Sequence, residues 1–488
     1  MRPSQCAALL AMLAVAIAGC STPKEPDLAA IYNAPASMIG PARTPVVVIP
    51  GILGSKLTDS ETGTRVWGSF TFGAADADKP DGARLMALPM REGAPLADLR
   101  DEVFPSDVLD VVVADVGLFR GLEIAAYVDL MKTLAAGRYR DQMLGESGAI
   151  DYGGQHYTCF QVPYDWRRSI PDAARELESI IQQAQITARF ELGLAEDAPI
   201  KVDVVAHSMG GLVLRYYLRY GTAPLPQDGS LPELTWAGAK HVRKAVLVGT
   251  PSAGSVLALK QLVEGMNLNP VFPNYRPALL GTMPAVFQLL PRTRHNTVVD
   301  AATGDPIDIF DPETWERYEW GLLAPGQDRV LRWLLPEAET REQRLAIARD
   351  HLDKTLRETV RFHRALDRPA TPPEGLEISL FAGDSEDTPA VLAVDDRGRI
   401  RIAETAPGDN TVTRASALMD ERFGNPYRPG LTSPVDWTRV QFVFADHIGL
   451  TRAATFTDNL LFILLEDDPQ PALLGAVQSE SIEAGDTP

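Results

Sequence analysis

The sequence has few cysteines and no excess of positive charge, and each shortage excludes a class of function. Its 488 residues include three cysteines, too few for a disulfide framework, and no C-x-x-C pair predicts a zinc site. Lysine and arginine number 46 against 65 aspartate and glutamate residues, so the formal net charge is −19. An acidic chain repels phosphate backbones. We therefore expect no nucleic-acid partner, no bound metal and no cofactor.

No hydrophobic run is long enough to span a bilayer, but the first one suits export. Residues 7–18 are apolar and follow Arg2, whereas a membrane-spanning helix needs about 20 such residues. Residues 1–19 therefore predict a signal peptide. Small residues precede Cys20, which resembles the lipobox of bacterial lipoproteins and implies a lipid anchor on Cys20. Because Ser21 is not an aspartate, we expect this anchor in the outer membrane of a bacterial cell envelope.

Composition divides the rest of the chain into a folded body and two polar ends. Residues 20–42 are rich in proline and predict a tether, and residues 467–488 are acidic and predict a flexible tail. The body, residues 43–466, has the apolar content of a globular protein. Cys159 is the thiol of this body, and we expect it to be buried.

The body has the pattern of an α/β fold. Continuous apolar runs, typical of buried parallel strands, occupy residues 46–49, 201–206, 242–249, 377–382 and 440–445. Helical patterns such as residues 172–192 lie between the strands. This alternation predicts a mostly parallel central sheet with helices on both faces.

Two segments interrupt the alternation. Residues 255–373 contain proline-rich turns and then a helical pattern over residues 341–366, which predicts a cap inserted into the sheet domain. Residues 58–136 form a second excursion, with glycine-rich turns and an apolar patch over residues 108–116. That patch is either buried core or part of a lid that faces lipid, and we favour core.

The turn after the second strand carries the strongest chemical signal. Ala206, His207, Ser208, Met209, Gly210 and Gly211 join that strand to a helix. A strand, a sharp turn with a serine and then a helix form the context of a nucleophile elbow. The free N–H groups of the helix N-terminus favour negative charge near the serine. We therefore predict Ser208 as a nucleophile.

A serine of ordinary pKa needs a base that is held by an acid. In this fold the chain order is serine, acid, histidine, and His447 follows the last predicted strand. We predict His447 as the base. His207 cannot serve, because neighbouring side chains diverge at a tight turn. We expect His351 and His363, on the cap helix, to be surface or packing residues.

Two aspartates compete for the role of the acid. Asp384 follows the strand over residues 377–382, and Asp409 lies in a tight polar loop. Their positions alone do not decide between them. Asp395 and Asp396 lie in the turn of a predicted hairpin and are expected to be turn residues only.

Several motifs, in the same order along the chain, resemble the lecithin:cholesterol acyltransferase family, which includes phospholipid:diacylglycerol acyltransferases. They are residues 45–57, the PYDWR string at 163–167, the HSMGG string at 207–211, the GTP string at 249–251, the GDNTV string at 408–412 and the loop of His447. The resemblance covers most of residues 45–465. It implies the α/β-hydrolase fold and a lid within residues 58–136.

The resemblance also implies roles for individual residues. Ser208 would be the nucleophile, Asp409 the acid and His447 the base, and the backbone N–H groups of Ile52 and Met209 would form the oxyanion hole. The sequence lacks the cysteines that close the lid in the animal plasma enzyme. The cap carries no family motif, so no preference for an acyl chain or an acceptor is implied.

The implied function is that of a serine-dependent lipid acyltransferase or esterase with an acyl-Ser208 intermediate. With water as acceptor, the same site would be a lipase or a phospholipase of the A type. Other possibilities are an enzyme for soluble esters and a catalytically inactive hydrolase fold that binds lipid.

Overall fold

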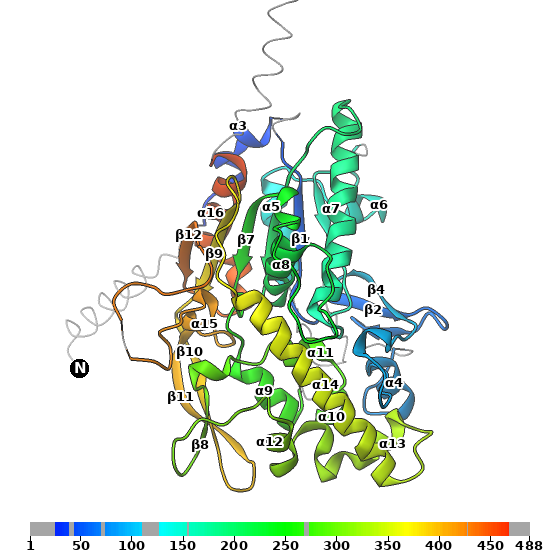
Figure 1. The fold of residues 1–488 in the computed structure, drawn as a ribbon. Helices are drawn as coiled ribbons and strands as arrows, with labels where there is room; N and C mark the ends of the chain where they lie inside the picture. Colours follow the sequence, from blue (N-terminus) through cyan, green and yellow to red (C-terminus); the bar gives the residue numbers. More distant parts are fainter. Residues whose placement is uncertain are drawn as a thin grey trace, which may run out of the picture.

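The computed structural model describes residues 25–38, 43–69, 74–109, 126–153, 156–267, 273–426 and 428–467 (Figure 1). The predicted signal peptide, Cys20, residues 110–116 of the apolar patch and residues 468–488 of the predicted tail lie outside the described residues. Among the helices of the described part, none is both long and apolar enough to cross a bilayer.

A six-stranded parallel sheet forms the centre of the domain. Its strand order is β12-β9-β7-β6-β1-β5, and every neighbouring pair is parallel. The strands are β1 (Val46–Ile49), β5 (Cys159–Gln161), β6 (Val202–His207), β7 (Val242–Val248), β9 (Glu377–Gly383) and β12 (Arg439–Val443). All five predicted strands are present within two residues of their predicted ends, which confirms the α/β prediction. The edge strand β5 was not predicted; it has three residues, and its Cys159 is buried.

Helices cover both faces of this sheet. Alternate strand residues face opposite sides, and both sets are apolar, so each side packs against helices. Val47 and Ile49 belong to the cluster that includes α7 (Ile170–Leu192) and α8 (Met209–Tyr220). Val46 and Val48 belong to a second cluster with α5 (Ala126–Ala136) and α16 (Ala454–Leu465). Strands that are apolar on both faces are therefore buried on both faces, as their sequence predicts.

The helix α7 begins two residues before its predicted start. Pro171 lies in the first turn, where its missing N–H removes no helical hydrogen bond. The helix ends at Gly193, whose φ of 63° suits the left-handed cap of a helix.

The predicted cap is a group of helices at one end of the sheet, with α14 (Arg341–Asp367) as its longest (Figure 1). The others are α9 (Val256–Glu264), α10 (Pro277–Leu280), α11 (Pro284–Gln288), α12 (Pro312–Arg317) and α13 (Asp328–Leu334). His351 and His363 of α14 are buried, so they are packing residues rather than surface residues. Short 3-10 turns include Gly321–Leu323 and Pro325–Gln327.

The cap also contributes a strand to a second sheet. β8 (Val298–Asp300) pairs with β10 (Glu386–Val394), which pairs in turn with β11 (Ile400–Gly408). The predicted hairpin is thus present. Asp395 accepts hydrogen bonds from the backbone N–H groups of Arg397 and Arg399, so it is the turn residue that the sequence predicts.

The described part of the second excursion ends in α5, and before it the chain forms a small antiparallel sheet that packs on the domain. It contains β2 (Ser55–Asp59), β3 (Arg65–Trp67), β4 (Val103–Val108) and the helix α4 (Pro80–Met86). Val108 and Leu109 are buried, as expected for core, whereas residues 110–116 of the patch are not described. Arg167 is buried, pairs with Asp165 and donates to the carbonyl of Leu85, which ties the excursion to the sheet.

Part of the predicted tether is folded onto the domain. Residues 25–38 include α2 (Leu28–Ile31) and α3 (Asn33–Ala36). Between them Tyr32 is only 3% exposed, and its hydroxyl donates to Asp458 Oδ1 over 2.6 Å. At the other end, Asp467 pairs with Arg439 at 2.6 Å. Residues 25–38 of the predicted tether therefore pack on the domain, because the aromatic side chain of Tyr32 gains a buried site.

Asp367 at the end of α14 gives the fold a dependence on pH. Burial alone would raise the pKa of its carboxyl group, but Arg292 and Arg294 lower that pKa to about 2. A lowered pKa stabilises the folded state above the unfolded value of 3.8, and this contribution is lost as the pH falls. Asp367→Asn should have a different unfolding free energy from the wild type. We predict that the gap between the two proteins is about 1 kcal/mol smaller at pH 3 than at pH 6. Urea unfolding at both pH values measures this, and an unchanged difference would contradict it.

Candidate active site

Ser208 lies at a strained turn between β6 and α8. Its backbone has φ 53° and ψ −125°, a conformation that costs a residue with a Cβ about 1–3 kcal/mol. Its N–H donates to the carbonyl of Val248 on the neighbouring strand over 2.8 Å, which holds the turn in place. This strand, serine and helix have the geometry that a nucleophile elbow requires.

Glycines allow the elbow to pack tightly against its neighbours. A Cβ on Gly211 would lie 2.0 Å from Thr250 Oγ1, and a Cβ on Gly51 would lie 2.8 Å from Ser208 Cβ. Both distances are far shorter than a van der Waals contact. The glycine at each position therefore lets the serine turn approach β7 and the loop after β1.

The structure brings the three predicted side chains together. His447 Nε2 lies 2.9 Å from Ser208 Oγ, and His447 Nδ1 lies 2.8 Å from Asp409 Oδ2. Asp409 is 1% exposed, and its other carboxylate oxygen accepts from the N–H groups of Thr411 and Val412. A buried carboxylate with this set of donors is held in one orientation toward the imidazole.

Asp384, the competing acid, has a different partner. Its Oδ2 pairs with Arg414 Nη1 at 3.1 Å, while Asp409 is the aspartate that bonds to His447. Both aspartates follow β9 in the chain, but the hairpin of β10 and β11 lies between them. The chain after this hairpin carries Asp409 back to the sheet, where a Cβ on Gly383 would lie 2.6 Å from Asp409 Cβ.

The backbone groups predicted for an oxyanion hole flank Ser208. Met209 is the first residue of α8, and Ile52 lies in the loop after β1 and lines the same cavity as Ser208. Among the described residues, the N–H groups of Ile52 and Met209 donate to no other group. Two free donors beside a serine hydroxyl suit a developing negative charge.

A largely apolar cavity of about 280 Å³ opens beside Ser208 and His447. Its walls come from the loop after β1, from the cap and from the loop of His447. The apolar lining includes Ile52, Leu53, Leu109, Trp166, Leu257, Met266, Met283, Val286, Leu289 and Ile448. Such a cavity can take up an apolar chain beside the serine.

Two residues that line this cavity are given no role in the site by the sequence. His207 was excluded as the base, and it is buried behind His447 instead. Tyr127 on α5 was not predicted at all, yet its hydroxyl accepts from the N–H of Gly51 over 2.6 Å. Their spacing of 80 residues follows no motif, so the sequence carries no signal for this pair.

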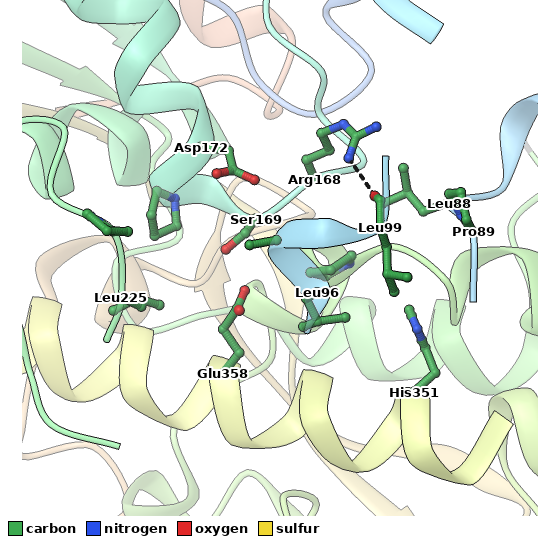
Figure 2. A pocket seen from close by; sticks show the side chains of 14 residues that line it. Leu88, Pro89, Leu96, Leu99, Arg168, Ser169, Asp172, Leu225, His351 and Glu358 are labelled. Carbon is green, nitrogen blue, oxygen red and sulfur yellow. Dashed lines mark hydrogen bonds between the residues drawn. The ribbon is translucent and has the colours of Figure 1, made fainter. Parts of the chain in front are cut away.

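A second, smaller pocket of about 60 Å³ lies between α7 and α14 (Figure 2). Figure 2 shows Ser169 and Glu358 pointing toward each other, with Arg168 donating to the carbonyl of Leu99 over 3.0 Å. Burial raises the pKa of Glu358. In this pocket Ser169 accepts from Gln288 Nε2, and His351 Nε2 bonds to the carbonyl of Thr282, so the serine and the histidine are not paired. The cavity at Ser208 is therefore the better candidate site. Within the described ranges, no cluster of three metal-binding side chains could hold a metal ion.

Part of the chain is similar to a known enzyme family. The sequence model of the lecithin:cholesterol acyltransferase family matches residues 115–324. In Arabidopsis thaliana, a candidate phospholipid:diacylglycerol acyltransferase 2 is 31% identical over 115 residues, and a phospholipid–sterol O-acyltransferase is 28% identical over 147 residues. These matches cover 24% and 30% of this chain. The chain spans only 16% and 22% of the length of these two curated relatives.

A solved structure shares the fold over most of the chain. One chain of the Tle4–Tli4 complex, a crystal structure, aligns with a TM-score of 0.56 and 16% sequence identity. The alignment covers 87% of this chain and 99% of that chain. At this identity the likeness concerns the fold alone.

The tight contact between α8 and the loop after β7 leads to a prediction for Gly211. We expect Gly211→Ala to lower the unfolding free energy by about 1–3 kcal/mol, because the new methyl group overlaps the buried side chain of Thr250. Gly326→Ala is the matched control, since its Cβ would meet no atom within 4 Å. Urea unfolding of both variants measures the difference. Equal stability of Gly211→Ala and the wild type would contradict the contact.

Proposed function

We propose that this protein is a serine-dependent acyltransferase of the lecithin:cholesterol acyltransferase type, which forms an acyl-Ser208 intermediate from a lipid ester. The observation that carries the proposal is the hydrogen-bonded chain from Ser208 through His447 to Asp409 at the mouth of an apolar cavity. The family match over residues 115–324 supports membership of that family for the whole chain.

The proposed reaction begins with the transfer of a proton. His447 Nε2 takes the proton of the Ser208 hydroxyl as the serine oxygen attacks the ester carbonyl, and Asp409 stabilises the imidazolium that forms. The N–H groups of Ile52 and Met209 would hold the oxyanion; loss of one such donor typically costs about 3 kcal/mol of transition-state stabilisation. His447 then returns its proton to the leaving alcohol, which departs as Ser208 becomes acylated.

The acceptor in the second half of the reaction determines whether the enzyme is a transferase or a hydrolase. A lipid alcohol that attacks acyl-Ser208 gives an acyltransferase, whereas water gives a lipase or phospholipase. The apolar walls around Ser208 favour a lipid acceptor, because they disfavour bulk water beside the acyl group. The largely apolar lining suits an ester with long apolar chains.

The position of the protein in the cell is part of the proposal. We propose that Cys20 carries a lipid anchor after removal of residues 1–19, and that the anchor holds the protein at the outer membrane of a bacterial envelope. The apolar run before Cys20 supports this location. An anchored enzyme meets lipid substrates at a raised local concentration.

The two aspartates after β9 give a test of the proposed acid. Asp409→Asn should lower kcat by about 10³–10⁴-fold, because the amide no longer stabilises the imidazolium or fixes its tautomer. Asp384→Asn is the matched control and should keep kcat within about threefold, since Asp384 pairs with Arg414. Hydrolysis of p-nitrophenyl esters measures both variants, with circular dichroism to verify folding. A silent Asp409→Asn together with a damaging Asp384→Asn would show that the acid is misassigned.

The nature of the acceptor can be tested on vesicles of a phosphatidylcholine that carries a labelled acyl chain. With a long-chain alcohol or a sterol in the membrane, we predict labelled ester as the main product and little free fatty acid. Chromatography of the extracted lipids separates the two, and Ser208→Ala should form neither. If free fatty acid predominates with every acceptor, the protein is a phospholipase rather than an acyltransferase.

A further inference from the structure

A chain of hydrogen bonds runs behind Ser208 and joins two loops of the site. The N–H of Gly51 donates to the Tyr127 hydroxyl over 2.6 Å, and that hydroxyl lies 3.1 Å from His207 Nδ1. On the other side of the ring, His207 Nε2 lies 3.1 Å from the backbone carbonyl of His447. We name these four groups the Tyr127–His207 bridge.

The direction of every hydrogen bond in the bridge is determined. The carbonyl of His447 can only accept, so His207 Nε2 must carry a proton and donate it. In a neutral imidazole, Nδ1 is then an acceptor, and the Tyr127 hydroxyl donates to it. The same hydroxyl oxygen accepts from Gly51, so no donor or acceptor of the bridge is left unpaired.

The surroundings keep both rings of the bridge neutral. Burial, with the nearby His447 as a second cause, lowers the pKa of His207 to about 3. Burial also raises the pKa of the Tyr127 hydroxyl well above its ordinary value. The rings meet edge to face, with centroids 5.8 Å apart, and the His207 ring lies 4.9 Å from that of His447. A neutral His207 ring adds no further charge beside His447.

The bridge connects the parts of the site that must be aligned during the reaction. Gly51 precedes Ile52, the proposed oxyanion donor. His447 is held at both ends of its backbone, because its N–H donates to the carbonyl of Asp409 over 2.8 Å and its carbonyl accepts from His207. These two bonds fix the backbone from which the imidazole reaches Ser208, and the bond from Nδ1 to Asp409 Oδ2 orients the ring itself.

We propose that Tyr127 and His207 are positioning residues, which align the loop of Gly51 and Ile52 with the loop of His447 for acyl transfer at Ser208. This inference rests on the proposed function. Neither residue touches the reacting atoms directly. Each acts through the backbone of a neighbour, so their loss should slow the chemical step and leave substrate binding nearly unchanged.

The test uses the full chain and p-nitrophenyl butyrate as substrate. Tyr127→Phe removes one hydroxyl and two hydrogen bonds, and it should lower kcat about 10- to 100-fold with KM within about twofold. His207→Leu should give a similar loss. His207→Gln should recover part of it, because its amide nitrogen can still donate to the carbonyl of His447. The double variant Tyr127→Phe/His207→Leu should lose less than the product of the two single losses, since both interrupt one bridge.

Tyr220→Phe is the matched control. Its hydroxyl is also buried and donates to the carbonyl of Ala365 over 2.8 Å, but it lies at the far end of α8. This variant should lose thermal stability and keep kcat. If the wild type is active and Tyr127→Phe and His207→Leu keep its kcat, the positioning role of the bridge is wrong, and the proposed function still stands. A loss confined to KM or to thermal stability would also overturn it. A wild type without esterase activity would overturn the proposed function, and the bridge with it.

Discussion

The hydrogen bond between His447 and Ser208 joins two loops that are 239 residues apart in the sequence. A length of 2.9 Å between flexible loops is improbable unless rigid elements place both ends. The parallel sheet provides that rigidity, because β6 and β12 both end at the same edge of the sheet and β6 is fully buried within it. The cost of the strained Ser208 backbone is offset by this packing. The sheet can therefore hold a conformation that the serine would not adopt alone.

The cap makes the space at this edge of the sheet largely apolar. Leu257 on α9, Val286 on α11 and neighbouring apolar residues enclose the space beside the serine. The ion pairs of Asp367 with Arg292 and Arg294 attach the end of α14 to the segment after α11. Charged residues thus hold the cap in place from outside the cavity, while the cavity wall itself stays largely apolar. This division suits a site for a lipid ester.

Much of the fold could be predicted because the strands are apolar on both faces. The strand over residues 46–49, the elbow at Ser208 and the position of His447 follow from local patterns that the structure reproduces. The short strand β5 could not be predicted, since its three residues resemble any apolar segment. The folded helices near Tyr32 were missed for a similar reason, because their stability depends on a distant partner, Asp458.

Contacts between residues far apart in the sequence also limit what could be predicted at the site. Asp384 and Asp409 both follow β9, and only the path of the hairpin between them decides which carboxylate reaches His447. Tyr127 follows no motif, because its role depends on a hydrogen bond to Gly51 and another to His207. Contacts between side chains far apart in sequence are invisible to periodicity, whereas a strand or a turn is encoded within about ten residues.

The most direct measurement is the mass of the peptide that contains Ser208 after a brief incubation with a p-nitrophenyl ester and an acid quench. Our account predicts that this peptide gains the mass of one acyl group, that fragmentation assigns the group to Ser208, and that Ser208→Ala gains none. An acyl group on another residue, or full activity in Ser208→Ala, would contradict it.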